Sequence, residues 1–244
     1  MDRPHLFLLD YDGTLTDFER DPERSLLSPR AKKVLQGLRK RYPVIFISGR
    51  YLKSLRKVSG LPHFPMVGTH GFESRNLPKH LRLASPAQER FYAKEAQGLW
   101  KAVQPLLRRF PGIHIEHKPY SSTLHYRGVA LSPAQVRSLE RGFRAIFRRS
   151  VTLERWDLMA GKMMLEAKPR GFNKGKAVKK IVRHFPDHRV VYAGDDITDL
   201  SVFKSLGKKG LKVAVGTRIP KRYSDLRFPS PKALLEWLAG FTRG

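Results

Sequence analysis

The chain has 244 residues, 41% of them hydrophobic, so it can bury a substantial core as one large domain or two small ones. It contains no cysteine, which excludes a disulfide framework, a thiolate metal site and a cysteine nucleophile. The 48 Lys and Arg residues against 21 acids give a formal charge of +27, which favours anionic ligands, and favours nucleic acid or an anionic membrane as nonspecific partners. The cations are spread along the chain, as is typical of a solvated surface. Without a signal-like N-terminus or an apolar run of membrane-spanning length, we expect a cytoplasmic protein.

The first predicted element is a buried strand that ends in two acids. Residues His5 to Leu9 form a short apolar run, and Asp10, Asp12 and Gly13 follow at once. Ligands of open α/β sheets bind outside the carboxyl ends of the strands, so we expect a site here. One carboxylate would act as a nucleophile and the other as an acid and base. The alternative interpretation is a surface Asp-Gly turn after a core strand.

Strands and helices then alternate, which predicts a parallel sheet in a three-layer arrangement. Ser28 and Pro29 predict the N-cap and the first position of a helix. The further elements expected in this alternation are strands over Pro43–Ile47 and Pro65–Gly68, a helix from near Lys174, strands over Arg189–Ala193 and Leu211–Val215, and a last helix from Pro231.

The middle of the chain breaks this alternation. Its order, α-β-β-α-β-β, predicts a separate inserted module with an antiparallel sheet. We therefore divide the chain into a core of residues 1–83 and 168–244 and an inserted module of residues 84–167. The predicted elements of the module are a long helix that includes Phe91 and Phe110, strands over Ile113–Lys118 and Ser122–Arg127, a helix over Pro133–Arg149, and strands over Val151–Trp156 and Met163–Ala167.

The second helix of the module carries a basic stripe opposite an apolar one. The stripe consists of Arg137, Arg141, Arg144 and Arg148, which recur at helical spacing. Such a stripe is able to contact phosphates, but a solvated outer face above an apolar, sheet-facing side is the simpler interpretation.

Polar side chains stand at several of the predicted strand ends. They are Asp10 and Asp12 at the first strand, Ser48 at the second, Asp195, Asp196 and Asp199 at a late strand, and Lys174 near a helix start. Carboxylates that converge on one crevice repel each other unless a cation lies between them, and all-oxygen ligation suits magnesium. A hydroxyl, helix N-terminal amides and a lysine suit a phosphoryl group. The reaction that fits is phosphoryl transfer to Asp10 and hydrolysis of the aspartyl-phosphate, with Asp12 as acid and then base. Taken singly, Ser48 reads equally well as a helix N-cap and Lys174 as a surface lysine.

In order and type these residues resemble the four motifs of the haloacid dehalogenase superfamily of phosphatases. The segment Asp10–Thr14 resembles the first motif, Ser48 the second, Lys174 the third and Gly194–Asp199 the fourth. The resemblance implies a three-layer, Rossmann-like α/β core with a parallel sheet and an inserted α/β cap with an antiparallel sheet. It also implies magnesium bound by Asp10, the backbone carbonyl of Asp12, and Asp195, with Asp196 and Asp199 close by, holding metal waters or Lys174.

Within the superfamily, the closest resemblance is to the trehalose-6-phosphate phosphatases. It is carried by Gly68–Glu73, Glu116–Lys118, His125–Arg127 and several positions between Gly161 and Gly175. The sugar-binding cap residues that it implies are Glu116, Lys118, Arg127, Lys162 and Glu166, and we assign Gly49 and Arg50, beside Ser48, to the substrate as well. The alternative for the cap charges is a set of cross-strand ion pairs on a solvated sheet face.

Four further positions are weighed beside that resemblance. The sequence departs from the family at His117, where an acid is common, and at Leu200, where the family often has Glu. For His70 we prefer a structural role as a buried turn histidine, and for Trp156 a place in the core.

The function implied is a magnesium-dependent hydrolysis of trehalose 6-phosphate to trehalose and phosphate. One alternative keeps the mechanism and changes the substrate to sucrose phosphate, a glycosyl-3-phosphoglycerate or another sugar phosphate. A mutase is a second alternative, and a basic nucleic-acid-binding protein on a hydrolase scaffold is a third. We expect a monomer whose partner is a small sugar phosphate, with no specific nucleic acid and no membrane.

Overall fold

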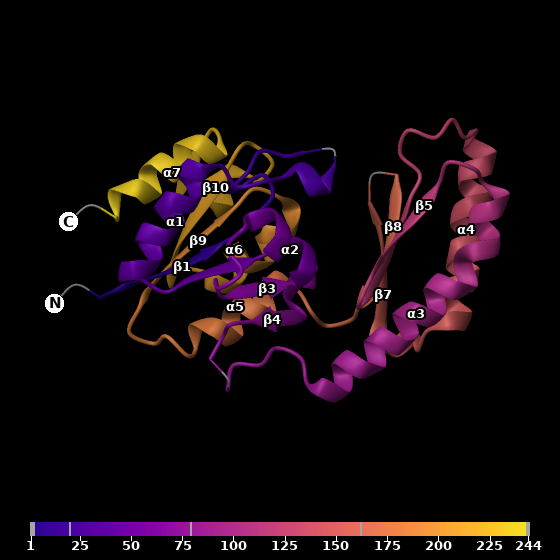
Figure 1. Cartoon of the computed structure of the whole chain (residues 1–244), viewed down its shortest axis with the longest axis horizontal. Helices are drawn as coiled ribbons and strands as arrows, with labels where there is room; N and C mark the ends of the chain where they lie inside the picture. Colours follow the sequence, from indigo (N-terminus) through magenta and orange to yellow (C-terminus); the bar gives the residue numbers. More distant parts are fainter. Residues whose placement is uncertain (1–2, 20, 79, 162, 243–244) are drawn as a thin grey trace. The chain divides into compact units, whose positions relative to one another are not determined.

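The computed structural model describes residues 3–19, 21–78, 80–161 and 163–242. The chain forms two compact units, Met1–Leu83 with Phe172–Gly244, and Ala84–Gly171. Each unit has its own sheet (Figure 1). The chain stays in the second unit beyond residue 167, because the last strand of that unit runs to Pro169.

The first unit is built on a seven-stranded sheet of order β11-β10-β9-β1-β2-β3-β4. All neighbouring pairs are parallel except β3 and β4. The parallel three-layer sheet predicted from the alternating pattern is therefore confirmed. Its strands are β1 (His5–Leu9), β2 (Val44–Ile47), β3 (Met66–Gly68), β4 (Glu73–Arg75), β9 (Arg189–Gly194), β10 (Gly210–Val215) and β11 (Leu226–Phe228).

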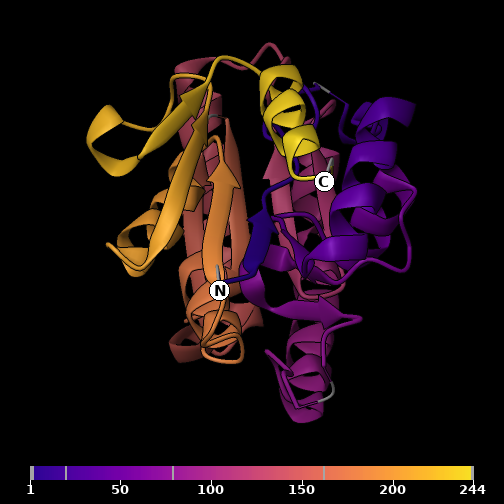
Figure 2. The ribbon, with the colours of Figure 1, turned by 90° about the vertical axis from the view of Figure 1, so that its left-hand side faces the viewer.

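Helices cover both faces of this sheet because successive residues of its buried strands point to opposite sides. Phe7 and Leu9 of β1 pack in a core with α1, α2 and α7, whereas Leu6 and Leu8 pack in a second core with α5 and α6. Helices α1 and α7 lie side by side on their face (Figure 2). The helices are α1 (Pro29–Arg41), α2 (Leu52–Ser59), α5 (Lys174–Val182), α6 (Leu200–Leu206) and α7 (Pro231–Gly240), and the short 3-10 turns are η1 (Pro22–Arg24), η2 (Thr69–Gly71), η4 (Ile197–Asp199) and η5 (Lys221–Tyr223).

The start of α1 illustrates how local sequence sets these boundaries. The Ser28 hydroxyl accepts a hydrogen bond of 3.1 Å from the Ala31 N–H, and Pro29 occupies the first turn, as predicted. The strands β4 and β11 were not predicted. Each has three residues at an edge of the sheet, too short for an alternating or apolar pattern to show.

The second unit is a four-stranded antiparallel sheet of order β5-β6-β8-β7 with two helices on one face (Figure 1). The helices share a core with the sheet through side chains such as Val103, Phe143, Leu124 and Leu165. The antiparallel inserted module is thus confirmed as a fold. Its elements are α3 (Pro86–Arg109), β5 (His114–Lys118), β6 (Ser121–His125), α4 (Pro133–Ser150), the 3-10 turn η3 (Leu153–Arg155), β7 (Trp156–Gly161) and β8 (Met164–Pro169).

The strand predicted over Val151–Trp156 is wrong, because the strand begins at Trp156 rather than ending there. Val151 is the C-cap of α4, and Glu95 of α3 accepts hydrogen bonds from the Thr152 N–H and hydroxyl, which fixes this segment as a turn. The predicted strand over Ser122–Arg127 likewise ends early, at His125. Trp156 is buried and donates its indole N–H to Glu95 at 2.6 Å, so it belongs to the core.

Among the described residues, no helix combines the length and the apolar character that crossing a bilayer requires.

Candidate active site

Three aspartates meet at the carboxyl edge of the large sheet. Asp10 follows β1 and Asp195 follows β9, and the parallel pairing of Leu9 with Ala193 sets the two strand ends side by side. The Asp10 N–H donates to the Ala193 carbonyl at 2.9 Å. One carboxylate oxygen each of Asp10, Asp195 and Asp199 lies within 4.8 Å of the other two, and all three side chains are buried or nearly so.

Lys174 lies between two of these acids. Its Nζ donates to Asp10 Oδ1 at 2.7 Å and to Asp199 Oδ1 at 2.8 Å, and its side chain is buried. Lys174 is the first residue of α5, where the Asn173 side chain accepts from the Lys176 N–H and caps the helix. The helix start therefore fixes the direction in which the lysine enters the acidic cluster.

The turn after β1 brings its own groups to the same place. The Thr14 hydroxyl lies 3.1 Å from Asp10 Oδ2 and 3.4 Å from Asp195 Oδ1. Gly13 has φ of +77°, and a Cβ there would lie 2.3 Å from Asp195 Oδ2. Only glycine permits both that backbone conformation and so close an approach of the carboxylate.

Asp199 is held from four directions. Its Oδ1 accepts from Lys174 and, at 2.5 Å, from the Tyr192 hydroxyl, while its Oδ2 accepts from the Asp195 N–H at 3.1 Å and the Asp196 N–H at 3.0 Å. With both oxygens engaged, Asp199 is better placed to orient Lys174 and the preceding turn than to bind a ligand directly. Sequence reasoning missed Tyr192. The signal available was a hydroxyl inside an otherwise apolar buried strand, which requires a partner.

The electrostatics of the cluster follow from this crowding. Burial raises the pKa of Asp10 well above its ordinary value, Lys174 opposes that shift, and the charges of Asp199 and Asp195 add to it. Burial, and then the charge of Asp199, raises the pKa of Asp195 to about 6. Burial alone would lower the pKa of Lys174, but the two acids outweigh it and raise that pKa above its ordinary value.

A cation fits this set of donors. The three carboxylates offer oxygen ligands within 4.8 Å of one another. Burial, together with the charges of the neighbouring acids, raises the pKa values of Asp10 and Asp195, and a divalent ion would offset both effects. Oxygen-only ligation is what hard cations such as Mg²⁺ prefer. The acids of this edge can therefore hold a divalent cation, with Asp10 and Asp195 as the ligands, because both oxygens of Asp199 already accept hydrogen bonds.

The Asp12 carboxylate points elsewhere. Arg50 Nε and Nη2 donate to its two oxygens at 2.6 Å each, and the Ser25 hydroxyl donates to Oδ1 at 2.9 Å. The Arg50 side chain is largely buried. From the sequence we expect Arg50 to bind the substrate, whereas in the structure Arg50 forms a bidentate pair with Asp12.

Ser48 and Gly49 form the tip of β2, next to β1 in the sheet. The Ser48 hydroxyl accepts from the Arg50 N–H at 3.1 Å, and its carbonyl accepts from the His70 N–H at 3.1 Å. A Cβ on Gly49 would lie 2.5 Å from the His70 ring, so glycine makes room for that half-buried histidine. His70 has φ of +53° in the turn η2.

Asp196 stands at the margin of the cluster. Its Oδ1 accepts from the Ile197 N–H at 2.7 Å and caps the turn η4. The exposed Arg218, which the sequence did not single out, lies 4.0 Å from both Asp195 and Asp196. Neither Asp12 nor Asp196 places its carboxylate in the three-acid cluster found among the described residues.

The predicted sugar-binding residues lie in the second unit. Glu116 and Lys118 of β5 share the sheet face that is not covered by helices, and register places Thr123 between Glu116 and Glu166 on that same face. Glu116 Oε2 lies 3.3 Å from Lys118 Nζ and 3.2 Å from His125 Nε2. Arg127 is exposed beyond the end of β6. Lys162 lies outside the described residues.

His117 points to the opposite side of that sheet. Its ring stacks on Trp100 of α3, with ring centroids 5.5 Å apart, and its Nε2 lies 3.0 Å from Gln97. The departure from the family pattern at this position therefore concerns the helix-facing side and leaves the polar face unchanged.

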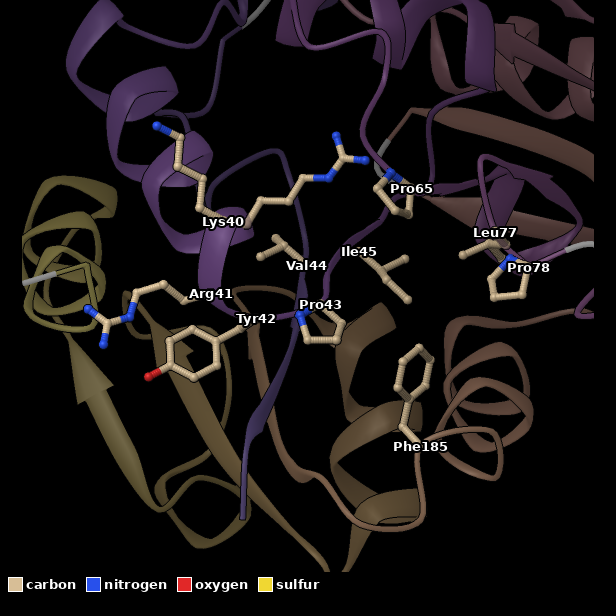
Figure 3. A pocket seen from close by; sticks show the side chains of 11 residues that line it. Lys40, Arg41, Tyr42, Pro43, Val44, Ile45, Pro65, Leu77, Pro78 and Phe185 are labelled. Atoms are coloured by element: carbon tan, nitrogen blue, oxygen red, sulfur yellow. The ribbon is translucent and has the colours of Figure 1, made fainter. Parts of the chain in front are cut away.

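A separate pocket of about 270 Å³ lies at the other edge of the large sheet (Figure 3). Pro43 and Val44, at the start of β2, line it together with Phe185 and Pro78. Ser48 follows the opposite end of the same strand, so this pocket is not part of the acidic site.

The fold is that of haloacid dehalogenase-like hydrolases, and the acidic cluster lies at the sheet edge where the motif resemblance places it. A haloacid dehalogenase-like hydrolase from Bacteroides thetaiotaomicron shares the fold, with a TM-score of 0.60, 15% identity and coverage of 97% of this chain and 98% of that one.

Sequence comparison identifies the family to which the chain belongs. A family model described as trehalose-phosphatase matches residues 8–225, and the chain belongs to this family. The trehalose-phosphate phosphatase of Mycobacterium marinum is 30% identical over 221 residues, which span 87% of this chain and 54% of the relative. The C-terminal domain of the Candida albicans trehalose-6-phosphate phosphatase is similar in structure, with a TM-score of 0.74, 25% identity and coverage of 98% and 92%. The chain thus spans about half the length of the curated relatives it matches.

Proposed function

We propose that this chain is a magnesium-dependent phosphatase that hydrolyses trehalose 6-phosphate to trehalose and phosphate. The observation that carries the proposal is the Asp10 carboxylate at the tip of β1, held by Lys174 and Thr14 and faced by Asp195. Membership of the trehalose-phosphatase family supports the choice of substrate.

The chain's own residues supply the two steps. In the first, an Asp10 oxygen attacks phosphorus, the bond from phosphorus to the sugar oxygen breaks, and Asp12 gives that oxygen a proton. In the second, Asp12 takes a proton from water, the water oxygen attacks phosphorus, and the bond to Asp10 breaks. Ser48 and Lys174 would bind phosphate oxygens.

Magnesium, held by Asp10, the carbonyl of Asp12 and Asp195, would offset the repulsion between the anionic nucleophile and the phosphate dianion. Asp199 and Asp196 would support that site by fixing Lys174 and the turn that carries Asp195. In this arrangement Arg50 engages both carboxylate oxygens of Asp12, so the pair must loosen when Asp12 carries a proton to the leaving group.

We propose that the polar sheet face of the second unit, residues 84–171, recognises the sugar. Glu116, Lys118 and Glu166 offer charge-assisted hydrogen bonds to hydroxyls, and Arg127, Lys162, Gly49 and Arg50 remain proposed substrate contacts. The hydroxyls of Ser121 and Thr123 support this role, because both are buried with no hydrogen-bond partner among the described residues.

A phosphate-release assay over a panel of substrates tests the proposal. The panel contains trehalose 6-phosphate, sucrose 6-phosphate, a glycosyl-3-phosphoglycerate, glucose 6-phosphate and p-nitrophenyl phosphate. We expect kcat/KM for trehalose 6-phosphate to exceed the others by at least about tenfold, with activity lost in EDTA and restored by Mg²⁺. Equal turnover of all members would reject the substrate, and phosphate returned to another hydroxyl instead of water would indicate a mutase.

We further propose that the enzyme works in the cytoplasm as a monomer. A chain without cysteine has no need of an oxidising compartment, which supports that location. Light scattering of the purified protein tests the oligomeric state.

A further inference from the structure

The two helices of the second unit carry a strong positive charge. Helices α3 and α4 each contain five Lys or Arg residues, against two glutamates on α3 and one on α4. Neither the proposed phosphatase chemistry nor the polar sheet face uses these cations, because the helices cover the opposite face of the sheet.

Seven of the cations form one exposed surface, which we call the basic face. Steps of four and seven residues keep side chains within about 40° of one another around a helix. On both helices these steps connect exposed cations, opposite the buried residues Val103 of α3 and Phe143 of α4. The basic face consists of Arg90, Lys94, Lys101 and Arg108 on α3 and Arg137, Arg141 and Arg148 on α4.

Two of the three glutamates on these helices, Glu95 and Glu140, are directed elsewhere. Glu95 accepts hydrogen bonds from Thr152 and Trp156, and Glu140 accepts from the Tyr126 hydroxyl and lies 3.9 Å from Arg144. Within the part of the chain that the structure describes, none of the seven cations of the basic face has an ion pair or a hydrogen bond from its side chain. Seven unpaired like charges on two packed helices repel each other, and a polyanion would relieve that repulsion.

The composition of the face decides which polyanion suits it. No large apolar side chain is exposed on α3 or α4 as described, so the face has nothing to insert between lipid headgroups. It also has no exposed aromatic ring on which an unpaired base could stack, as single-strand binding requires. What remains is a set of Arg and Lys side chains over a helix of roughly 27 Å between Arg90 and Arg108, which matches contacts to duplex phosphates.

We propose that the basic face binds double-stranded nucleic acid through its phosphates, without reading sequence. A duplex carries one charge per about 1.7 Å, so the phosphates on one side of a segment as long as α3 outnumber or equal the cations facing them. The sugar-facing side of the same sheet stays free, so duplex binding and phosphatase activity are independent. This inference does not depend on the identity of the sugar phosphate.

Fluorescence anisotropy with a labelled 20-base-pair DNA, measured from about 50 to 200 mM KCl, tests the proposal. Each phosphate neutralised adds about 0.9 to the slope of log K against log salt. Replacing Arg137, Arg141 and Arg148 with Gln should lower the magnitude of that slope by about 3 and weaken binding at least tenfold at the lowest salt. Phosphatase activity should stay at the level of the parent, which also shows that the variant is folded.

The matched control removes the same charge from exposed lysines of the first unit, Lys208, Lys209 and Lys232, each replaced with Gln. This variant should change the slope by less than one. Equal losses in the two variants would overturn the proposal, since net charge alone would then explain the binding. Binding to phosphatidylserine vesicles without binding to the duplex would overturn it as well, and so would no binding to either.

Discussion

Arg50 holds Asp12 through two parallel hydrogen bonds of 2.6 Å, one to each carboxylate oxygen. This pair joins the turn after β1 to the residue that follows the tip of β2. It also occupies the group to which we assign proton transfer, so the pair and the reaction compete for the same carboxylate. The consequence is a residue that acts on catalysis through another residue, without needing to touch the phosphate.

Removing the bidentate Arg50–Asp12 pair should therefore lower kcat by different factors for substrates with different leaving groups. We expect Arg50→Gln to lower kcat for a sugar phosphate by about 10- to 100-fold, within the range that general acid catalysis contributes. The loss should be smaller for p-nitrophenyl phosphate, whose leaving group needs no proton in the first step. In the Asp12→Asn background, Arg50→Gln should add little, because the two residues act together. Equal and additive losses on both substrates would contradict a role through Asp12 and leave substrate contact as the only role of Arg50.

Replacing Lys174 should lower the free energy of unfolding by a large amount. Replacing it with Ala leaves the buried Asp10 and Asp199 without their shared cation, and breaking such a pair costs about 3–5 kcal/mol. The matched control is Lys176→Ala on the exposed side of the same helix start, which should change the free energy of unfolding by less than about 0.5 kcal/mol. Chemical denaturation in EDTA measures both variants. A loss at Lys174 no larger than at Lys176 would contradict the buried pairing.

The raised pKa of Asp195 predicts how the stability of the metal-free fold depends on pH. Its pKa of about 6 in the folded chain exceeds the unfolded value of 3.8, so the folded state binds the extra proton. This group therefore destabilises the metal-free fold above pH 6, and the penalty disappears as the pH falls from 6 towards 4. We expect Asp195→Asn to raise the thermal midpoint in EDTA at pH 7.5 and to leave it nearly unchanged at pH 4.5. The reverse order at the two pH values would refute the shift.

The same titration predicts weaker metal binding in acid. Protons compete with a cation for a carboxylate whose pKa is about 6, so the apparent affinity for Mg²⁺ should fall as the pH drops through 6. Titration calorimetry at pH 7.5 and 5.5 measures the change. An affinity that does not depend on pH would remove Asp195 from the metal site.

Because Glu116 and His117 of β5 point to opposite faces of the sheet, substitutions at these two neighbours should have different effects on substrate binding. Glu116→Gln should raise KM for trehalose 6-phosphate at least about fivefold and leave p-nitrophenyl phosphate unaffected, because the larger substrate alone reaches the polar face. His117→Gln, on the helix-facing side, should change neither value. Equal effects on both substrates would mean that the cap residues were wrongly assigned.

Much of this architecture could be predicted because it depends on local patterns. The apolar run of β1 before Asp10, and the cap at Ser28, each follow from a few adjacent residues. The convergence of Asp10 and Asp195 was also predictable, since parallel strands bring their carboxyl ends to one edge, and the motif resemblance grouped Lys174 with them.

Other features depend on contacts that no local pattern records. The bidentate pair of Arg50 and Asp12 joins residues 38 positions apart in the sequence. The hydrogen bonds from Thr152 and Trp156 to Glu95 join residues about 60 positions apart. Those bonds decide that β7 starts at Trp156, whereas the β-branched Val151 and Thr152 alone favoured a strand. The pair of Arg144 with Glu140, by contrast, is an i,i+4 contact within one helix and could have been predicted from helical spacing.

The phenol of Tyr192 can serve as a spectroscopic probe of the acidic site. Burial, and then the charge of Asp199, raises the pKa of its phenol well above the ordinary value. In an alkaline absorbance titration Tyr192, like the buried Tyr11, should stay silent while exposed phenols ionise, and it should respond only when β9 opens. The chain thus contains a native optical reporter, set against the acidic edge of its large sheet, that needs no label.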